Sequence, residues 1–152
     1  MIIKNKLDIT FGPFGTSTGL FLVLGGMVAT YFSPVGLLLV FIGSFIWLTT
    51  TSTFIDTKKN RVKFSNDLFG IIHAGKWIEI KPGMKLGFKK AHRGYRAYSR
   101  GSQTTGIHLI DYRIILYGPD NKEIFPLKKT DSPEAAKGEQ AKLAELLGLE
   151  II

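Results

Sequence analysis

The feature that most constrains this chain is a stretch of 45 residues, 11–55, that contains no Asp, Glu, Lys, Arg or His. A membrane-spanning helix needs about 20 mostly apolar residues to cross roughly 30 Å of hydrocarbon. Two apolar runs, 15–32 and 35–53, are about that long and are separated only by Ser33 and Pro34. Proline removes a backbone donor and disfavours helix in the residue before it, so the chain should turn there. The sequence therefore predicts a two-helix transmembrane hairpin within an N-terminal segment, residues 1–55.

Small residues recur along both predicted helices. Their spacing lets helix backbones approach closely in lipid, where little hydrophobic force holds helices together. The predicted packing positions are Gly15, Gly19, Gly25, Ala29, Gly36 and Gly43. These residues would either pack the hairpin against itself or form an interface with a membrane-protein partner or a second copy of the chain.

Positive charge lies on both sides of the predicted hairpin. Lys4 and Lys6 precede it, Lys58 and Lys59 follow it, and the connecting turn is uncharged. Because Lys and Arg are enriched in cytoplasmic flanks of membrane helices, both termini are predicted to be cytoplasmic. Residues 56–105 hold twelve basic and three acidic side chains, or nine positive units against +8 for the whole chain. This local excess favours an anionic lipid surface or an acidic partner.

Residues 56–152 are predicted to form one cytoplasmic domain, mostly of β structure. Short runs with alternating apolar residues, separated by polar or Gly/Pro turns, predict about six or seven antiparallel strands between residues 51 and 127. In the longest run, Asp111 and Arg113 are expected on a solvated strand face.

The last predicted element is an amphipathic helix. Ser132 is a suitable N-cap, Pro133 suits the first helical position, and Gly148 offers a stop. A strand meander followed by one C-terminal helix resembles the bacterial membrane-anchored pleckstrin-homology-like (PH-like) proteins, in which a two-helix hairpin leads directly into the first strand. The resemblance is carried by Phe54-Ile55-Asp56 through Asn60-Arg61-Val62, by Tyr112 to Gly118 with Asn121 to Leu127, and by Ser132-Pro133-Glu134 with Leu146-Leu147-Gly148-Leu149.

This resemblance implies an α+β, mostly β fold: a PH-like antiparallel β-barrel closed by the C-terminal helix, joined to the membrane α-hairpin. It also implies a non-enzymatic scaffold or binding module, located in the bacterial inner (cytoplasmic) membrane as a multi-pass protein. It assigns no ligand and no cofactor.

Residues 81–105 are the most basic and the least strand-like part of the predicted domain. A mobile loop here would gather the predicted lipid- or partner-binding residues Lys85, Lys89, Lys90, Arg93, Tyr95, Arg96, Tyr98 and Arg100. Basic side chains near a bilayer attract anionic headgroups by roughly 1 kcal/mol each. Cytoplasmic juxtamembrane segments are also basic for reasons of topology alone, so both interpretations stay open.

Other classes of function have little support in the sequence. The three histidines are too scattered to suggest a metal site, and the chain has no cysteine and no Gly-rich phosphate loop. Arg and Tyr could contact nucleic acid, but no recognised motif accompanies them, so nucleic acid is an unlikely partner. The sequence thus predicts no enzyme and no cofactor. It favours an accessory or scaffold subunit of an inner-membrane complex, and the alternative is a peripheral lipid- or ligand-binding regulator with the hairpin as a passive anchor.

Overall fold

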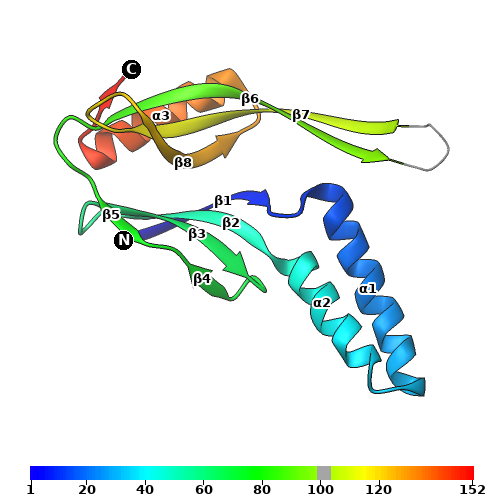
Figure 1. Ribbon diagram of the computed structural model, residues 1–152. Coiled ribbons are helices and arrows are strands. Elements are labelled where there is room, and N and C mark those ends of the chain that lie inside the picture. Colours follow the sequence, from blue (N-terminus) through cyan, green and yellow to red (C-terminus); the bar gives the residue numbers. More distant parts are fainter. Residues whose placement is uncertain (99–103) are drawn as a thin grey trace.

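The computed structural model describes residues 1–98 and 104–152, and within them the chain is an α+β protein with three helices and two sheets (Figure 1). In chain order the elements are β1 (Ile2–Ile9), α1 (Gly12–Phe32), α2 (Gly36–Leu48), β2 (Thr50–Asp56), β3 (Arg61–Leu68), β4 (Ile72–Ala74), β5 (Trp77–Glu79), β6 (Lys85–Tyr98), β7 (Thr104–Tyr117), β8 (Glu123–Thr130), α3 (Pro133–Leu147) and β9 (Glu150–Ile151).

The first sheet has the strand order β1-β2-β3-β4, and β5 also pairs with β3. β1 runs antiparallel to β2, with Ile2 opposite Asp56 and Ile9 opposite Thr50. The sequence prediction did not include β1. The predicted domain boundary after residue 55 therefore cuts through β2, and the helical hairpin is inserted between two neighbouring strands of one sheet.

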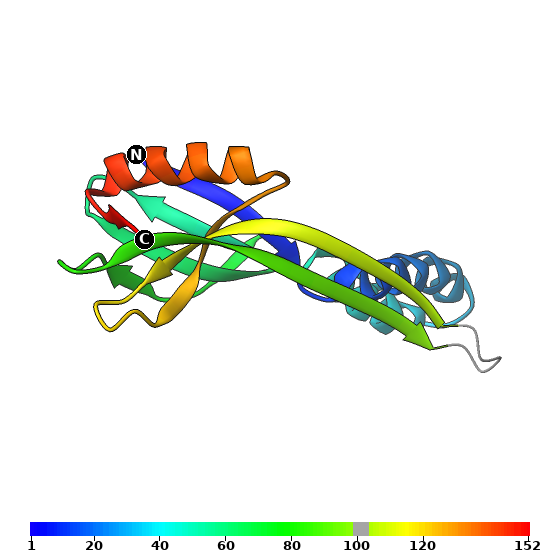
Figure 2. The ribbon, with the colours of Figure 1, turned by 90° about the horizontal axis from the view of Figure 1, so that it is seen from above.

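The second sheet has the order β8-β7-β6-β9 and is dominated by two strands of 14 residues each, β6 and β7. Their pairing continues from Lys85 opposite Tyr117 to Tyr98 opposite Thr104. Figures 1 and 2 show the distal half of this pair extending as an arm on the same side of the molecule as α1 and α2. The prediction of a mobile loop within residues 81–105 is wrong for residues 89–98, which continue β6, and for residues 104–105, which begin β7.

The hydrophobic core lies between the two sheets and α3. Its fully buried members include Ile55 and Val62 from the first sheet and Leu86, Ile114 and Leu116 from the second. Side chains also join the sheets, because Thr53 Oγ1 donates to the carbonyl of Pro126 (2.8 Å) and Asn5 Nδ2 to that of Leu127 (3.2 Å). The α+β class is confirmed, whereas a closed barrel is not, since the backbone pairing between the described strands divides into two separate sheets.

The C-terminal helix α3 is confirmed in its position and in its caps. Ser132 Oγ accepts a hydrogen bond from Ala135 N (3.2 Å), and Pro133 occupies the first turn. Gly148 ends the helix with φ of 64°, a left-handed conformation that glycine adopts readily. Leu143 and Leu147 point from this helix into the core.

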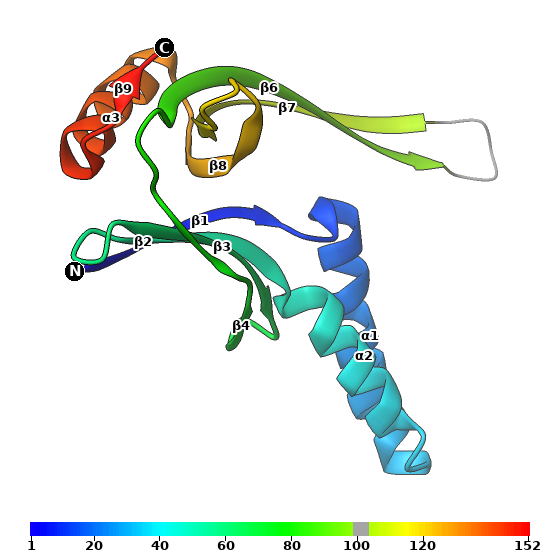
Figure 3. The ribbon, with the colours of Figure 1, turned by 60° about the vertical axis from the view of Figure 1, so that its left-hand side comes forward.

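The helices α1 and α2 form an antiparallel hairpin that projects away from both sheets (Figures 1 and 3). The predicted turn at Ser33 and Pro34 is present, and Ser33 N donates to the carbonyl of Ala29 (2.9 Å). Among the described residues, α1 is the one helix that is long and apolar enough to cross a membrane, because α2 has only 13 residues. The prediction of two full spans is thus supported for α1 alone.

Of the predicted packing residues, four lie between the two helices: Gly19, Ala29, Gly36 and Gly43. A Cβ atom on Gly43 would lie 2.7 Å from the carbonyl oxygen of Gly19, so only glycine permits this approach. Gly25 instead faces open space, and Gly15 meets only Phe11. Gly26, which the prediction did not include, lies against Val40.

Candidate functional site

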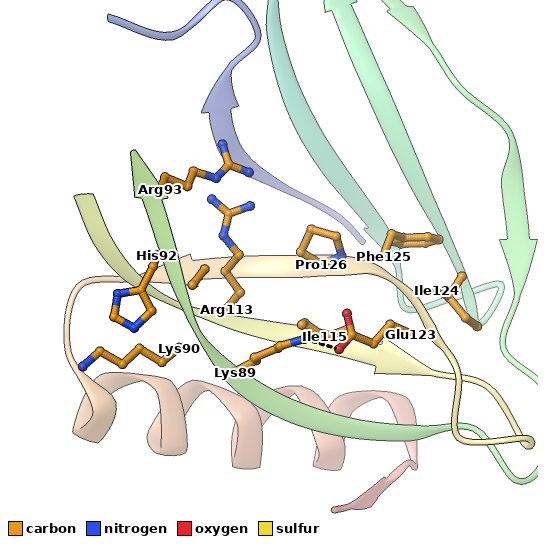
Figure 4. Close-up of a pocket in the computed structure, with 11 residues that line it drawn as sticks. Lys89, Lys90, His92, Arg93, Arg113, Ile115, Glu123, Ile124, Phe125 and Pro126 are labelled. Carbon is orange, nitrogen blue, oxygen red and sulfur yellow. Dashed lines mark hydrogen bonds and ion pairs between the residues drawn. The ribbon is translucent and has the colours of Figure 1, made fainter. Parts of the chain in front are cut away.

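A cavity of about 520 Å³ lies beside β6, β7 and β8 (Figure 4). Its basic side is formed by Lys89, Lys90, His92, Arg93 and Arg113, and its apolar side by Ile115, Ile124, Phe125 and Pro126. Glu123 is the acidic residue in the lining. A cavity that is basic on one side and apolar on the other suits an anionic group attached to an apolar body.

Arg93 and Arg113 meet at Asp8, which comes from β1 of the opposite sheet. Nη2 of Arg113 lies 2.9 Å, and Nη2 of Arg93 3.0 Å, from Oδ2 of Asp8. Arg113 also pairs with Asp111 at 2.8 Å, and Lys129 approaches Asp111 at 3.3 Å. We call these five residues the Asp8 cluster. It joins the two sheets, and its three bases and two acids carry one net positive charge.

Asp111 and Arg113 are only 2% and 7% exposed, so the expectation of a solvated strand face is wrong. The physical reason is Asp8, because β1 brings this carboxylate over the face that the prediction left to solvent. Burial opposes the charge of Arg113, but hydrogen bonds and charges from Asp111 and Asp8 outweigh it and raise its pKa. Burial likewise opposes the charge of Asp111, and Arg113 and Lys129 lower its pKa in spite of it. Both groups therefore stay charged in the folded protein.

The predicted basic residues do not form one surface. Side chains alternate between the two faces of a strand, so β6 places on opposite faces basic residues that a loop could have brought together. Lys89 pairs with Glu123 at 2.7 Å, and Lys85 lies 3.9 Å from Glu150 at the other end of the sheet. Figure 4 shows Lys90 extending away from Arg93 and the rest of the Asp8 cluster.

Tyr95 belongs to the arm and lies against the beginning of α1. Its ring approaches Gly12 so closely that a side chain at that position would overlap it. The arm therefore touches the base of the helical hairpin. Arg96 and Tyr98 lie within β6, but their side chains fall outside the described part of the structure, as does the whole of Arg100.

A second polar cluster lies on the first sheet, around Asp67, which is 1% exposed. Its carboxylate accepts from Ser52 (2.7 Å) and Ser65 (3.0 Å), and it pairs with Lys4 (2.9 Å) and His73 (2.7 Å). Burial opposes the charge, but these four partners outweigh it and lower the pKa of Asp67 to about 2. Asp67 was not among the predicted residues, and no local signal marks it, since its partners come from β1, β2, β3 and β4.

Aromatic rings and cations lie side by side elsewhere on the first sheet. Arg61 stacks 4.4 Å from the ring of Trp77, and Lys63 lies 5.9 Å from the same ring. Lys4 lies 5.3 Å from the ring of Phe54. Such contacts contribute roughly 0.5–1 kcal/mol each when exposed, so they stabilise the sheet and leave its outer face basic.

Within residues 1–98 and 104–152, no three His, Cys, Asp or Glu side chains come together in a way that could hold a metal ion. Comparisons with protein-family models, with curated proteins and with solved structures find no significant match to this chain.

Proposed function

We propose that this chain is a membrane-anchored, non-enzymatic binding protein that acts as an accessory or scaffold subunit at the inner face of a bacterial cytoplasmic membrane. The observation that carries the proposal is the apolar surface of the helical hairpin. Its exposed residues include Phe21 (74%), Val28 (65%), Leu38 (62%) and Phe41 (63%). Soluble monomers rarely expose apolar patches of this size, whereas lipid solvates them.

The charges around the hairpin support a cytoplasmic location of the rest of the chain, the two sheets with α3, which we call the β domain. Because α1 and α2 are antiparallel, the basic residues before α1 and after α2 lie on the same side of the hairpin. They include Lys4 and Lys6 in β1 and Lys58 and Lys59 after β2. Positive flanks are retained on the cytoplasmic side, so both termini belong there.

We extend the proposal to the PH-like assignment. Under this assignment, the two sheets form the two halves of one β-barrel, and α3 closes one end of that barrel. The shared core of Ile55, Leu86 and Leu116 supports this reading, and so do the hydrogen bonds from Thr53 and Asn5 to the carbonyls of β8.

The partner surface of the leading proposal is the outer face of α1 together with the basic β domain. Gly25 has open space around it, so the backbone of another membrane helix could approach there. The second candidate function is a peripheral regulator that binds an anionic lipid or another anionic amphiphile. The cavity next to the Asp8 cluster favours this candidate, because its lining combines basic residues, Lys90 and Arg93 among them, with apolar residues such as Phe125.

Membrane anchoring is tested by washing membranes with alkaline carbonate and sedimenting them. The full chain is expected in the pellet. The matched control replaces residues 11–48 with Asn-Gly, which suits a tight turn, because Ile9 already lies opposite Thr50 in neighbouring antiparallel strands. This shortened chain is expected in the supernatant. A full chain that stays in solution would refute the anchor.

The two candidate functions separate in two further measurements. A subunit purified in mild detergent should bring down a stoichiometric partner and lose it when Gly25 is replaced by Leu. If the chain instead binds lipid, the shortened chain should bind anionic vesicles, and Lys90→Gln should weaken this binding about fivefold. A fivefold change corresponds to the roughly 1 kcal/mol by which one basic side chain is attracted to an anionic surface. Lys137→Gln, on the exposed side of α3, is the matched control. Equal binding to neutral and anionic vesicles would reject the lipid candidate, and purification of the chain alone would reject the subunit.

A further inference from the structure

We infer that the helical hairpin enters the bilayer without crossing it, so that the turn at Ser33 and Pro34 ends within the hydrocarbon. This inference rests on the proposed membrane function and specifies how the chain is held. It concerns the depth that the hairpin can reach, which follows from the lengths of the helices, from the position of the nearest charges and from the hydrogen bonds of the turn.

The length of α2 sets the first limit on how deep the hairpin can reach into the hydrocarbon. Its 13 residues, Gly36–Leu48, rise about 20 Å at 1.5 Å per residue, whereas the hydrocarbon core is about 30 Å thick. The 21 residues of α1 would be long enough alone. However, Gly19 packs against Gly43 and the backbone of Trp47, near the end of α2. Because α1 and α2 are antiparallel, only about the first turn of α1 extends past the end of α2, on the side of the β domain.

Charged groups prevent the hydrocarbon from extending past the end of α2. Thr50 lies opposite Asp67, and Thr51 lies opposite Asp8. Asp67 is paired with Lys4, and Asp8 is paired with two arginines. Ionised groups at the level of the first residues of β2 are too costly to place in lipid. The apolar depth thus ends near Thr49, and any tilt of the hairpin makes it smaller.

The turn between β3 and β4 brings the β domain still closer to the hairpin turn. Phe69, in this turn, lies 5.3 Å from the rings of both Phe41 and Phe45 of α2. Phe41 is seven residues before the end of the helix, or about 10 Å along its axis. After Gly70, Ile71 and Ile72 are 78% and 58% exposed. These apolar side chains suit the boundary between headgroups and acyl chains, where they shorten the immersed part of α2 further.

The turn between α1 and α2 is built to remain in lipid. Unpaired backbone groups are costly in hydrocarbon, and a turn that reaches water does not need to satisfy them. Here the backbone N–H groups around Pro34 all have protein partners: Ser33 donates to Ala29 O, Val35 to Ser33 Oγ, Gly36 to Ser33 O, Leu37 to Pro34 O and Leu38 to Val35 O. Tyr31 and Phe32 flank the turn with exposed rings, and residues 31–40 carry no charge.

The test uses single cysteines, since the chain has none of its own. Ser33→Cys and Val35→Cys place a thiol at the turn, and Ala141→Cys places one on the exposed side of α3. Each full-length variant is expressed in bacterial cells. Spheroplasts and inverted inner-membrane vesicles are then treated with a membrane-impermeant maleimide, and labelling is expressed relative to the same sample in detergent.

Ala141→Cys should be labelled in inverted vesicles only. Both turn variants should be labelled at least tenfold more slowly in spheroplasts and in inverted vesicles than in detergent. Labelling of the turn in spheroplasts would show that the hairpin crosses, and would overturn this inference while leaving the membrane anchor intact. Labelling of the turn in inverted vesicles, together with Ala141→Cys, would place the hairpin outside the bilayer and overturn the proposed function as well.

Discussion

Replacing Asp67 with Asn should destabilise the β domain in a way that depends on pH. The carboxylate is buried and held by four partners, and its pKa falls from 3.8 to about 2 on folding. A shift of about 1.8 pKa units corresponds to about 2.4 kcal/mol of stabilisation of the folded state. Because the pKa in the folded state is the lower one, this stabilisation is fully present well above pH 3.8 and is lost as the pH falls toward 2. Asn has the shape of the protonated acid and lacks the charge at every pH.

The assay is urea unfolding of the full chain in detergent micelles, followed by the fluorescence of Trp77 with Trp47 replaced by Phe. At pH 7 the free energy of unfolding of Asp67→Asn should be about 2.4 kcal/mol below that of the parent, and at pH 3 the difference should fall to about 1.3 kcal/mol. Asp131→Asn, an exposed matched control, should differ little at either pH. A difference that stays constant between pH 7 and pH 3 would refute the role given to the charge of Asp67.

Two further predictions concern the helices. Gly43→Ala should lower the stability of the hairpin by about 1–3 kcal/mol, since its Cβ would meet the backbone of Gly19. Gly25→Ala should be neutral or stabilising, because its Cβ would meet nothing. The thermal midpoints of the two variants in detergent compare them directly, and equal midpoints would contradict the packing. Ser132→Ala should cost about 1 kcal/mol by removing the cap of α3, and Ser132→Asn should restore most of it, as measured by urea unfolding.

Local signals in the sequence predicted the elements that local interactions determine. The break at Ser33 and Pro34 and the caps of α3 at Ser132 and Gly148 are present where expected. In each case the deciding physics involves residues within one helical turn of each other. The two packing glycines that face each other, Gly19 and Gly43, were also found, because small-residue spacing along one helix is visible in the sequence.

The predictions that failed depended on contacts between distant segments. β1 alternates apolar and polar residues weakly, and its role becomes clear only when it pairs with β2, more than 40 residues later. β6 is rich in basic residues and contains Gly87 and Gly94, which weaken the strand pattern of its own sequence. It forms a strand because it pairs along its whole length with β7. Asp111 and Arg113 were assigned to solvent because no property of their own strand indicates that Asp8 will cover them.

The insertion of α1 and α2 between adjacent strands also has a mechanical consequence. Only Thr10 and Phe11 separate β1 from α1, only Thr49 separates α2 from β2, and Thr10 N donates to the carbonyl of Thr49 (3.3 Å). A flexible linker would let a domain rotate freely relative to its anchor, but two connections this short fix the orientation and distance of the first sheet relative to the helices. A change in the inclination of the helices is therefore expected to rotate the first sheet with them. In the proposed membrane-bound state, the lipid that holds the helices would then also set the orientation of the β domain.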